Sequence, residues 1–142
     1  MKNPLLLLAT LLVCAAFPLH AQEMSAPEAF EAAQAGKVKL IDIRTPPEWK
    51  QTGVAKDATL INMIQPQGAQ GFLDEVLKKV DGDKTAPIAL ICRTGNRSTQ
   101  VQKFLKAQGF THVYNVEEGM AGSRAGPGWM ARKLPTETCK AC

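Results

Sequence analysis

The sequence contains few aromatic residues, few histidines and no dense run of basic residues. Aromatic side chains make up 6% of its 142 residues, two residues are histidine, and the net charge is only +4. Proteins that bind nucleic acid through their surface charge carry a concentrated basic patch or stripe. We therefore expect no nucleic-acid partner, whereas the mild positive excess suits a small anionic substrate.

The sequence also lacks an apolar run long enough to cross a membrane as a helix, which takes about 20 residues. Its longest largely apolar run covers residues 5–17, follows Lys2 and ends at a proline, and Ala21 suits the position before a cleavage site. This order of features predicts a secretory signal peptide over residues 1–21, with cleavage after Ala16 as an alternative. We therefore expect no membrane span and a periplasmic or secreted protein.

Cysteine is scarce, and removal of the signal peptide also removes Cys14, whose lipidation is an alternative use of the N-terminus. Three cysteines then remain. Because this number is odd, one thiol of an exported protein stays free or pairs between molecules. Cys139 and Cys142, in a C-terminal tail over residues 135–142, are close enough to form a small disulfide ring and so leave Cys92 free. A redox pair that acts on Cys92 is the alternative for this tail. Two cysteines alone do not complete a zinc site, so we expect no metal.

Apolar runs alternate with amphipathic segments along the mature chain, after a loose start at residues 22–24. Capping boxes at Ser25–Glu28 and Thr45–Glu48 begin two of the predicted helices. The expected strands cover residues 38–43, 58–63, 87–91 and 112–116, and the expected helices cover residues 26–35, 45–49, 71–80, 98–106 and 129–132. Such alternation predicts one α/β domain over residues 22–134, with a parallel sheet flanked by helices on both faces.

The chemistry of the chain is concentrated where the apolar strand 87–91 ends in Cys92. A short polar loop with Arg93, Gly95 and Arg97 follows, and then a helix. A strand, a tight loop and a helix N-terminus bring backbone N–H groups and positive partial charge together, which makes an anion cradle. A cysteine in this cradle is expected to ionise easily and act as a nucleophile. The structural alternative is a cysteine that ends a core strand in a loop that only binds anions.

The loop Cys92-Arg93-Thr94-Gly95-Asn96-Arg97-Ser98 resembles the active-site loop of the rhodanese family, which reads Cys-Arg-x-Gly-x-Arg-Ser. Phosphatases that share the rhodanese architecture carry one more residue between the cysteine and the arginine, which accommodates a larger oxyanion. Four residues separate the two here, and this is the length found in sulfur transfer. The resemblance therefore favours a sulfurtransferase over a phosphatase or an arsenate reductase.

The similarity extends over nearly all of the mature chain. The segment Ile41-Asp42-Ile43-Arg44 resembles an early Asp-x-Arg segment of the family. The chain departs from the family pattern at Val54, where a histidine is usual, and at Glu118-Gly119, where a double glycine is common. These departures lie outside the loop, so they bear on specificity more than on the class of reaction.

The resemblance implies an enzyme that moves sulfane sulfur, without a cofactor, from thiosulfate or a persulfide donor to a thiophilic acceptor. Cys92 would carry the sulfur as a persulfide, and the main-chain N–H groups from Arg93 to Ser98 would stabilise its charge. The donor would be a small anion, and the acceptor would be cyanide-like or a thiol, including a protein thiol. A persulfide carrier or binding module without turnover is the alternative from another functional class.

The same resemblance suggests roles for the charged residues around the cysteine. Arg93 is expected to face the mouth of the loop and to attract the anion, and Arg97 to brace the loop or neighbouring carboxylates. Asp42 and Arg44 are expected to support the loop from behind. An ordinary ion pair at the end of a strand is the alternative for these two residues.

Overall fold

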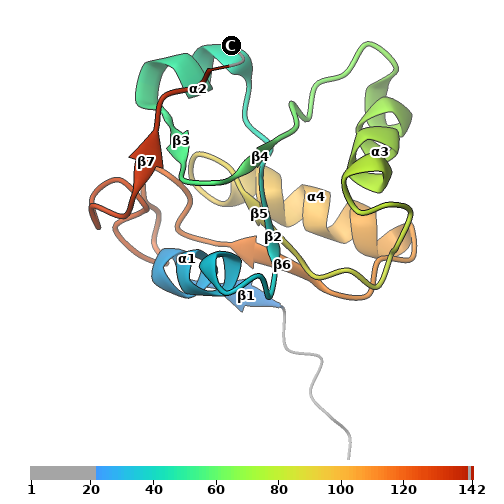
Figure 1. Cartoon of the computed structure of the whole chain (residues 1–142), viewed down its shortest axis with the longest axis horizontal. Helices are drawn as coiled ribbons and strands as arrows, with labels where there is room; N and C mark the ends of the chain where they lie inside the picture. The colour runs from blue at the N-terminus through green and yellow to red at the C-terminus, as the bar shows by residue number, and fades with distance from the viewer. Residues whose placement is uncertain (1–21, 141) are drawn as a thin grey trace, which may run out of the picture.

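The computed structural model describes residues 22–140 and residue 142, so the predicted signal peptide at residues 1–21 lies outside the described residues. Strands and helices alternate along most of the described chain, except where β4 follows β3 and β7 follows β6 (Figure 1). In chain order they are β1 (Glu23–Met24), α1 (Ala26–Gln34), β2 (Lys39–Asp42), α2 (Pro46–Thr52), β3 (Val54–Ala55), β4 (Thr59–Leu60), α3 (Gly68–Lys79), β5 (Ile88–Ile91), α4 (Asn96–Ala107), β6 (Val113–Val116) and β7 (Thr136–Glu137).

Five strands form the main sheet in the order β1-β6-β5-β2-β4, and each neighbouring pair is parallel. The central strand β5 is buried along its whole length. Ile88 and Leu90 pack in one apolar cluster with α3 and α4, whereas Ala89 and Ile91 pack in a second cluster with α1. Because successive side chains of a strand point to opposite faces, one short strand supplies both cores. This arrangement confirms the predicted parallel sheet with helices on both faces.

Both predicted capping boxes are present at helix starts. The N–H of Ser25 donates to a carboxylate oxygen of Glu28 at 2.8 Å, and the N–H of Glu28 donates to the Ser25 hydroxyl at 3.4 Å. At α2 the N–H and hydroxyl of Thr45 both donate to Glu48 Oε2, at 3.0 and 2.9 Å. The local signals thus place these two helix starts correctly.

The chain start at residues 22–24 is a strand rather than the predicted loose segment. β1 pairs in parallel with β6 at the edge of the main sheet, and the N–H of Asn115 donates to the carbonyl of Gln22 at 2.8 Å. The strand has only two residues, Glu23 and Met24, which is too few to show a period in the sequence. Its existence depends on β6, which lies about ninety residues further along the chain.

A second sheet, also absent from the prediction, joins the tail to the domain. β7 pairs antiparallel with β3, so that Val54 lies opposite Glu137 and Ala55 opposite Thr136. The predicted tail at residues 135–142 therefore begins as part of the fold. The expected strand 58–63 is reduced to Thr59–Leu60 as β4.

The predicted short helix at 129–132 is wrong, because these residues form turns. The Trp129 side chain is fully buried and packs edge-on against Phe30, with ring centroids 5.9 Å apart. Its indole N–H donates to the carbonyl of Pro135 at 3.0 Å. The tryptophan thus stabilises the segment by burial and one tertiary hydrogen bond, and no helical turn is required.

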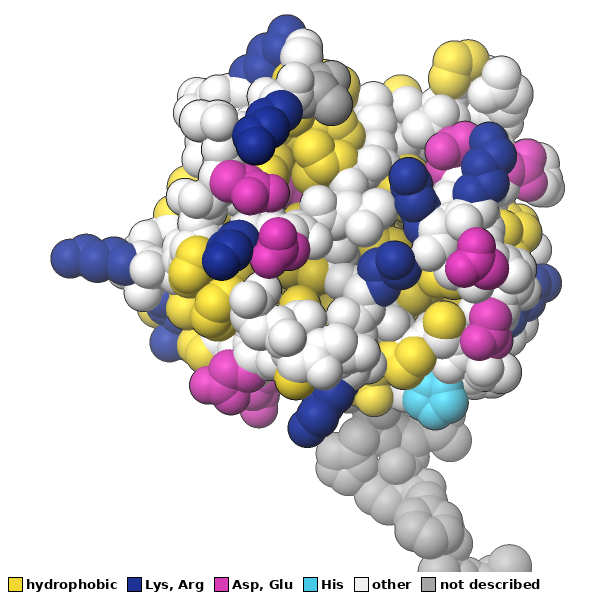
Figure 2. Space-filling view, viewed as in Figure 1, with side chains coloured by type: hydrophobic (Ala, Val, Ile, Leu, Met, Phe, Trp, Pro, Cys, Tyr) yellow, Lys and Arg dark blue, Asp and Glu magenta, His cyan; other side chains and the backbone are white. Residues whose placement is uncertain are grey.

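None of the helices among the described residues is long and apolar enough to cross a membrane. On the face shown in Figure 2, lysine and arginine side chains are scattered singly and several stand beside acidic ones. This face therefore carries no continuous basic patch of the kind that binds nucleic acid.

Candidate active site

Cys92 follows β5 directly and lies at the carboxyl edge of the main sheet, where the loop leads into α4. Its side chain is 1% exposed and, among the described residues, is the free thiol. The main-chain N–H of Gly95 donates to Cys92 Sγ at 3.1 Å, and the Ser98 hydroxyl lies 3.3 Å from the same sulfur. The loop therefore folds around the sulfur atom and directs the Gly95 N–H toward it.

Glycine at position 95 is required by the tightness of this loop. Gly95 has a φ of +88°, in the region that other residues rarely adopt. A Cβ added there would overlap the carbonyl oxygen of Glu117, which lies just beyond β6. The segment beyond β6 also holds the loop from outside, because the N–H groups of Met120 and Ala121 donate to the carbonyls of Cys92 and Arg93 at 2.9 and 2.8 Å.

The N-terminus of α4 lies at the loop, and its first turn leaves main-chain N–H groups without acceptors inside the helix. The helix dipole adds positive partial charge at the same point. The hydroxyls of Ser98 and Thr99 donate to the carbonyl of Gly95, at 3.1 and 2.8 Å, and so fix the turn. The N-terminal end of α4 and the loop together form the anion cradle expected from the sequence.

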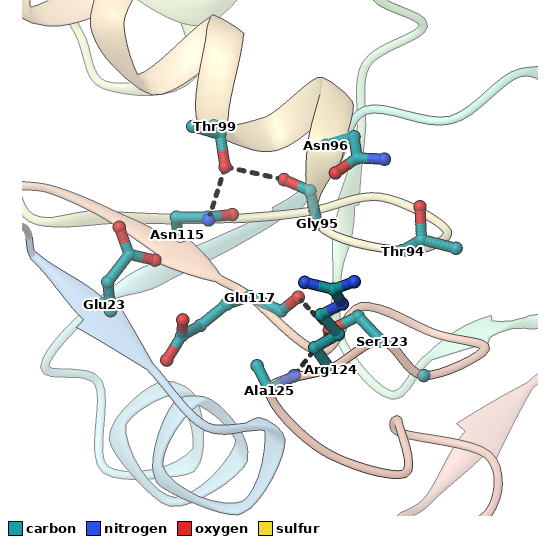
Figure 3. A pocket seen from close by; sticks show the side chains of 11 residues that line it. Glu23, Thr94, Gly95, Asn96, Thr99, Asn115, Glu117, Ser123, Arg124 and Ala125 are labelled. Carbon is teal, nitrogen blue, oxygen red and sulfur yellow. Dashed lines mark hydrogen bonds between the residues drawn. The ribbon is translucent and has the colours of Figure 1, made fainter.

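A hydrogen-bond chain from β6 also reaches this loop. Asn115, which is 2% exposed, donates from Nδ2 to the Thr99 hydroxyl at 3.0 Å, and Thr99 in turn donates to Gly95 (Figure 3). Neither Thr99 nor Asn115 was singled out from the sequence. Asn115 is a polar residue inside a strand that is otherwise apolar, and this break in the apolar pattern is the signal that could have identified it.

The two arginines of the loop have different surroundings. Arg97 forms a two-pronged ion pair with Glu48 of α2, with Nη1 and Oε2 2.9 Å apart. The hydrogen bonds from Arg97 lower the pKa of Glu48 to about 2, although burial opposes the shift. Of the two partners expected for Arg97, the loop or neighbouring carboxylates, the structure places a carboxylate against its guanidinium. The Arg93 side chain is exposed and has no hydrogen-bond partner among the described residues.

Asp42 and Arg44 form a buried ion pair at the end of β2, with exposed fractions of 0% and 1%. Arg44 Nη2 lies 2.6 Å from Asp42 Oδ2 and also donates to the carbonyl of Gly53 at 2.9 Å. Arg44 Nη1 donates to the Thr52 hydroxyl at 2.8 Å. The pair therefore ties the strand end to the end of α2, next to the loop, and all of its charge is compensated.

A hollow of about 400 Å³ opens between the loop and α2, and we call it the Arg93 cleft. Its wall comes from Arg44, Glu48, Gln51, Thr52, Arg93, Met120, Ala121 and Met130. Cys92 is not part of this wall, because the loop covers it. Arg44 is neutralised by Asp42 and Glu48 by Arg97, so Arg93 gives the cleft a positive balance, which suits an anionic donor.

A larger hollow, of about 920 Å³, lies on the Thr94–Asn96 side of the loop (Figure 3). Glu23 and Glu117 contribute carboxylates to it, and Arg124 is its one arginine among the described lining residues. Burial raises the pKa of Glu23, and the neighbouring Glu117 adds to this effect. The Arg93 cleft is therefore the better site for a small anion despite its smaller volume.

The tail cysteines are joined as predicted. Cys139 and Cys142 form a disulfide, and Cys92 is left as a thiol. Within residues 22–140 and 142, no group of three or more histidine, cysteine or acidic side chains is placed to hold a metal ion.

A free thiol at the end of a central parallel strand, in a loop that leads into a helix N-terminus, characterises this α/β domain. Residues 25–125 match the model of the family described as the rhodanese-like domain. The chain therefore belongs to the rhodanese-like family, which is of the sulfurtransferase type.

Relatives with sequence similarity include an uncharacterized protein of Rickettsia prowazekii, RP600. It is 30% identical over 98 residues, which cover 68% of this chain and 80% of the relative. The thiosulfate sulfurtransferase GlpE of Pseudomonas syringae is 31% identical over 88 residues, which cover 54% of this chain and 81% of that enzyme.

Solved structures with the same fold include the polysulfide-sulfur transferase homodimer of Wolinella succinogenes. It has a TM-score of 0.63 and 27% identity, and the match covers 85% of this chain and 81% of that one. Rv0390 from M. tuberculosis also has a TM-score of 0.63, with 24% identity over 82% of this chain and 97% of that one. The second likeness bears on the fold alone.

Proposed function

We propose that this protein transfers sulfane sulfur from thiosulfate or a persulfide donor to a thiophilic acceptor, with Cys92 as the catalytic residue. The observation that carries the proposal is the contact at 3.1 Å between the Gly95 N–H and Cys92 Sγ, in a loop that begins α4. The family and the named relatives GlpE and the polysulfide-sulfur transferase support the same class of reaction.

In the first step the Cys92 thiolate attacks the outer sulfur of thiosulfate. A sulfur–sulfur bond forms to Cys92, the sulfur–sulfur bond of thiosulfate breaks, and its electron pair leaves with sulfite. The Gly95 N–H and the N–H groups of the first turn of α4 stabilise the resulting persulfide anion, as an oxyanion hole stabilises an oxygen anion. Arg93, exposed at the edge of the cleft, attracts the donor.

In the second step cyanide or a thiolate attacks the outer sulfur of the Cys92 persulfide. The product is thiocyanate or a new persulfide, and the electron pair of the broken bond returns to Cys92 as a thiolate. No proton donor is needed for cyanide, because both leaving groups in the cycle are stable anions. The cycle thus needs only the thiol, its hydrogen-bond donors and a positively charged entrance.

A multiple-turnover assay with thiosulfate and cyanide tests this proposal. We expect many thiocyanate molecules per chain, with a rate proportional to the concentration of the protein. One sulfur bound per chain and no further turnover would identify a persulfide carrier instead. A phosphatase or arsenate reductase would turn over an aryl phosphate or arsenate and not thiosulfate, a result that the four-residue spacing between Cys92 and Arg97 opposes.

We further propose that residues 1–21 direct export and are removed, so that the mature protein is periplasmic or secreted. The order of Lys2, the apolar run and Ala21 supports this proposal. N-terminal sequencing of the protein recovered from each cell fraction tests it. We expect Gln22 as the first residue in the exported fraction, whereas an intact Met1 in the cytosolic fraction would contradict export.

A further inference from the structure

The Cys139–Cys142 disulfide is not explained by stability. Its two cysteines are three positions apart, and a ring of this size removes little entropy from the unfolded chain. Both cysteines are partly exposed, whereas Cys92 is 1% exposed. A surface disulfide of this kind is open to exchange with external thiols, and a buried one is not.

The fold places this pair beside the Arg93 cleft. Glu137 lies opposite Val54, and a Cβ added to Gly53 would come within 2.8 Å of the Glu137 carbonyl oxygen. Gly53 directly follows α2, whose last residue, Thr52, lines the cleft together with Arg93. In the view of Figure 1 the chain beyond β7 passes over α2. The tail therefore leaves β7 next to Gly53, one residue beyond the end of α2 that lines the cleft.

The start of the tail is held firmly in this position. The N–H of Lys56 and the indole N–H of Trp129 both donate to the carbonyl of Pro135 at 3.0 Å. Cys139 lies two residues beyond Glu137, so its Cα is within about 7 Å of that paired residue. A tether this short gives the tail thiols a high effective concentration at the cleft.

We propose that the Cys139–Cys142 pair, in its dithiol form, removes the sulfane sulfur from the Cys92 persulfide and releases it as hydrogen sulfide. This inference rests on the proposed function, because it needs the persulfide. To that function it adds a second reaction, the reductive release of sulfide, and an acceptor of the sulfur within the same chain.

The reaction balances in two exchanges. A tail thiolate attacks the outer sulfur of the Cys92 persulfide, which transfers that sulfur and restores the Cys92 thiolate. The other tail thiol then attacks the inner sulfur of the new persulfide, forms the Cys139–Cys142 disulfide and expels hydrosulfide. Two thiols are oxidised to a disulfide, and one sulfane sulfur is reduced to sulfide. An external protein dithiol reduces the disulfide for the next cycle.

Single-turnover sulfide release tests the proposal on the full mature chain. The protein is reduced with dithiothreitol, freed of reductant without oxygen, and mixed with one equivalent of thiosulfate. We expect about one sulfide per reduced chain, together with a new tail disulfide in the mass spectrum. The same protein with its tail disulfide intact is the matched control, and we expect it to hold one sulfur on Cys92 and release none.

One double variant distinguishes this proposal from the sulfurtransferase itself. The double variant Cys139→Ala with Cys142→Ala should form the Cys92 persulfide and give thiocyanate with cyanide at the rate of the parent, but release less than about a tenth of its sulfide. Equal sulfide release by the double variant and the parent would overturn the tail's role. Absence of both persulfide and thiocyanate from the double variant and the parent would overturn the proposed function instead.

Mixing two variants that are each expected to lack sulfide release tests whether the tail acts within its own chain. Cys92→Ser supplies a tail without a carrier, and the double variant supplies a carrier without a tail. We expect the mixture to release sulfide at least about tenfold more slowly than the parent at equal concentration. Equal rates of sulfide release by the mixture and the parent would overturn the proposal that the acceptor lies in the same chain, and would show that the reaction occurs between chains.

Discussion

Replacing Glu48 with glutamine tests whether the Arg97–Glu48 pair holds the loop in shape. Glutamine keeps the size and one acceptor oxygen of the side chain but removes its charge. In the folded protein the carboxylate receives both prongs of Arg97 and the N–H of Thr45. We therefore expect Glu48→Gln to lower the free energy of unfolding at neutral pH and to leave the fold unchanged.

The expected loss of unfolding free energy follows from the pKa of Glu48, which Arg97 lowers from 4.5 to about 2. At about 1.4 kcal/mol for each pH unit, this shift corresponds to roughly 3 kcal/mol at most. The two side chains are 24% and 33% exposed, so screening by water reduces the expected loss to about 1–2 kcal/mol. Because the folded-state pKa is the lower one, this contribution is complete above about pH 4.5 and disappears as the pH falls toward 2.

Urea unfolding of the parent and of Glu48→Gln at pH 7 and pH 3 measures this effect. The difference between the two proteins should be less than half as large at pH 3 as at pH 7. Glu75→Gln is the matched control, because Glu75 pairs with Lys78 on the surface, where that lysine is 68% exposed. We expect a smaller change in the control. A difference for Glu48→Gln that does not vary with pH would refute the reasoning.

Three other substitutions separate the roles of the loop residues. Arg93→Ala should raise the KM for thiosulfate about tenfold, because we propose that this arginine binds the anion. The melting temperature should change by no more than a degree or two, because the Arg93 side chain has no hydrogen-bond partner among the described residues. Steady-state kinetics and thermal melting check these two outcomes. Gly95→Ala should abolish transfer and lower the melting temperature, because its methyl group overlaps the Glu117 carbonyl. Thr99→Val should cost about 1 kcal/mol in urea unfolding and lower kcat, because it breaks the link from Asn115 to the loop.

The parts of this fold that were predicted correctly depend on signals close together in the sequence. The run from Ile88 to Ile91, the cysteine and the helix that follows are consecutive, so periodicity and composition are enough to place them. The capping box at Ser25 similarly needs only four residues. The loop around Cys92 is likewise continuous, and its glycine marks the tight turn.

The parts that were missed depend on contacts between distant segments. β1 exists only because it pairs with β6, and β7 only because it pairs with β3. The Arg97–Glu48 pair joins residues 49 positions apart, so the sequence suggested a carboxylate partner for Arg97 without identifying it. Local patterns carry no information on which segments meet, because that choice depends on the packing of the whole sheet.

The central claim is that the sulfur in transit is bound to Cys92. Intact-mass and peptide analysis after incubation with thiosulfate measures this most directly. We predict a gain of one sulfur atom on the peptide that contains Cys92, lost again on addition of cyanide with release of thiocyanate. We predict no gain in Cys92→Ser, which should remain folded because serine is nearly isosteric. A folded Cys92→Ser protein that still binds and transfers sulfur would contradict the account.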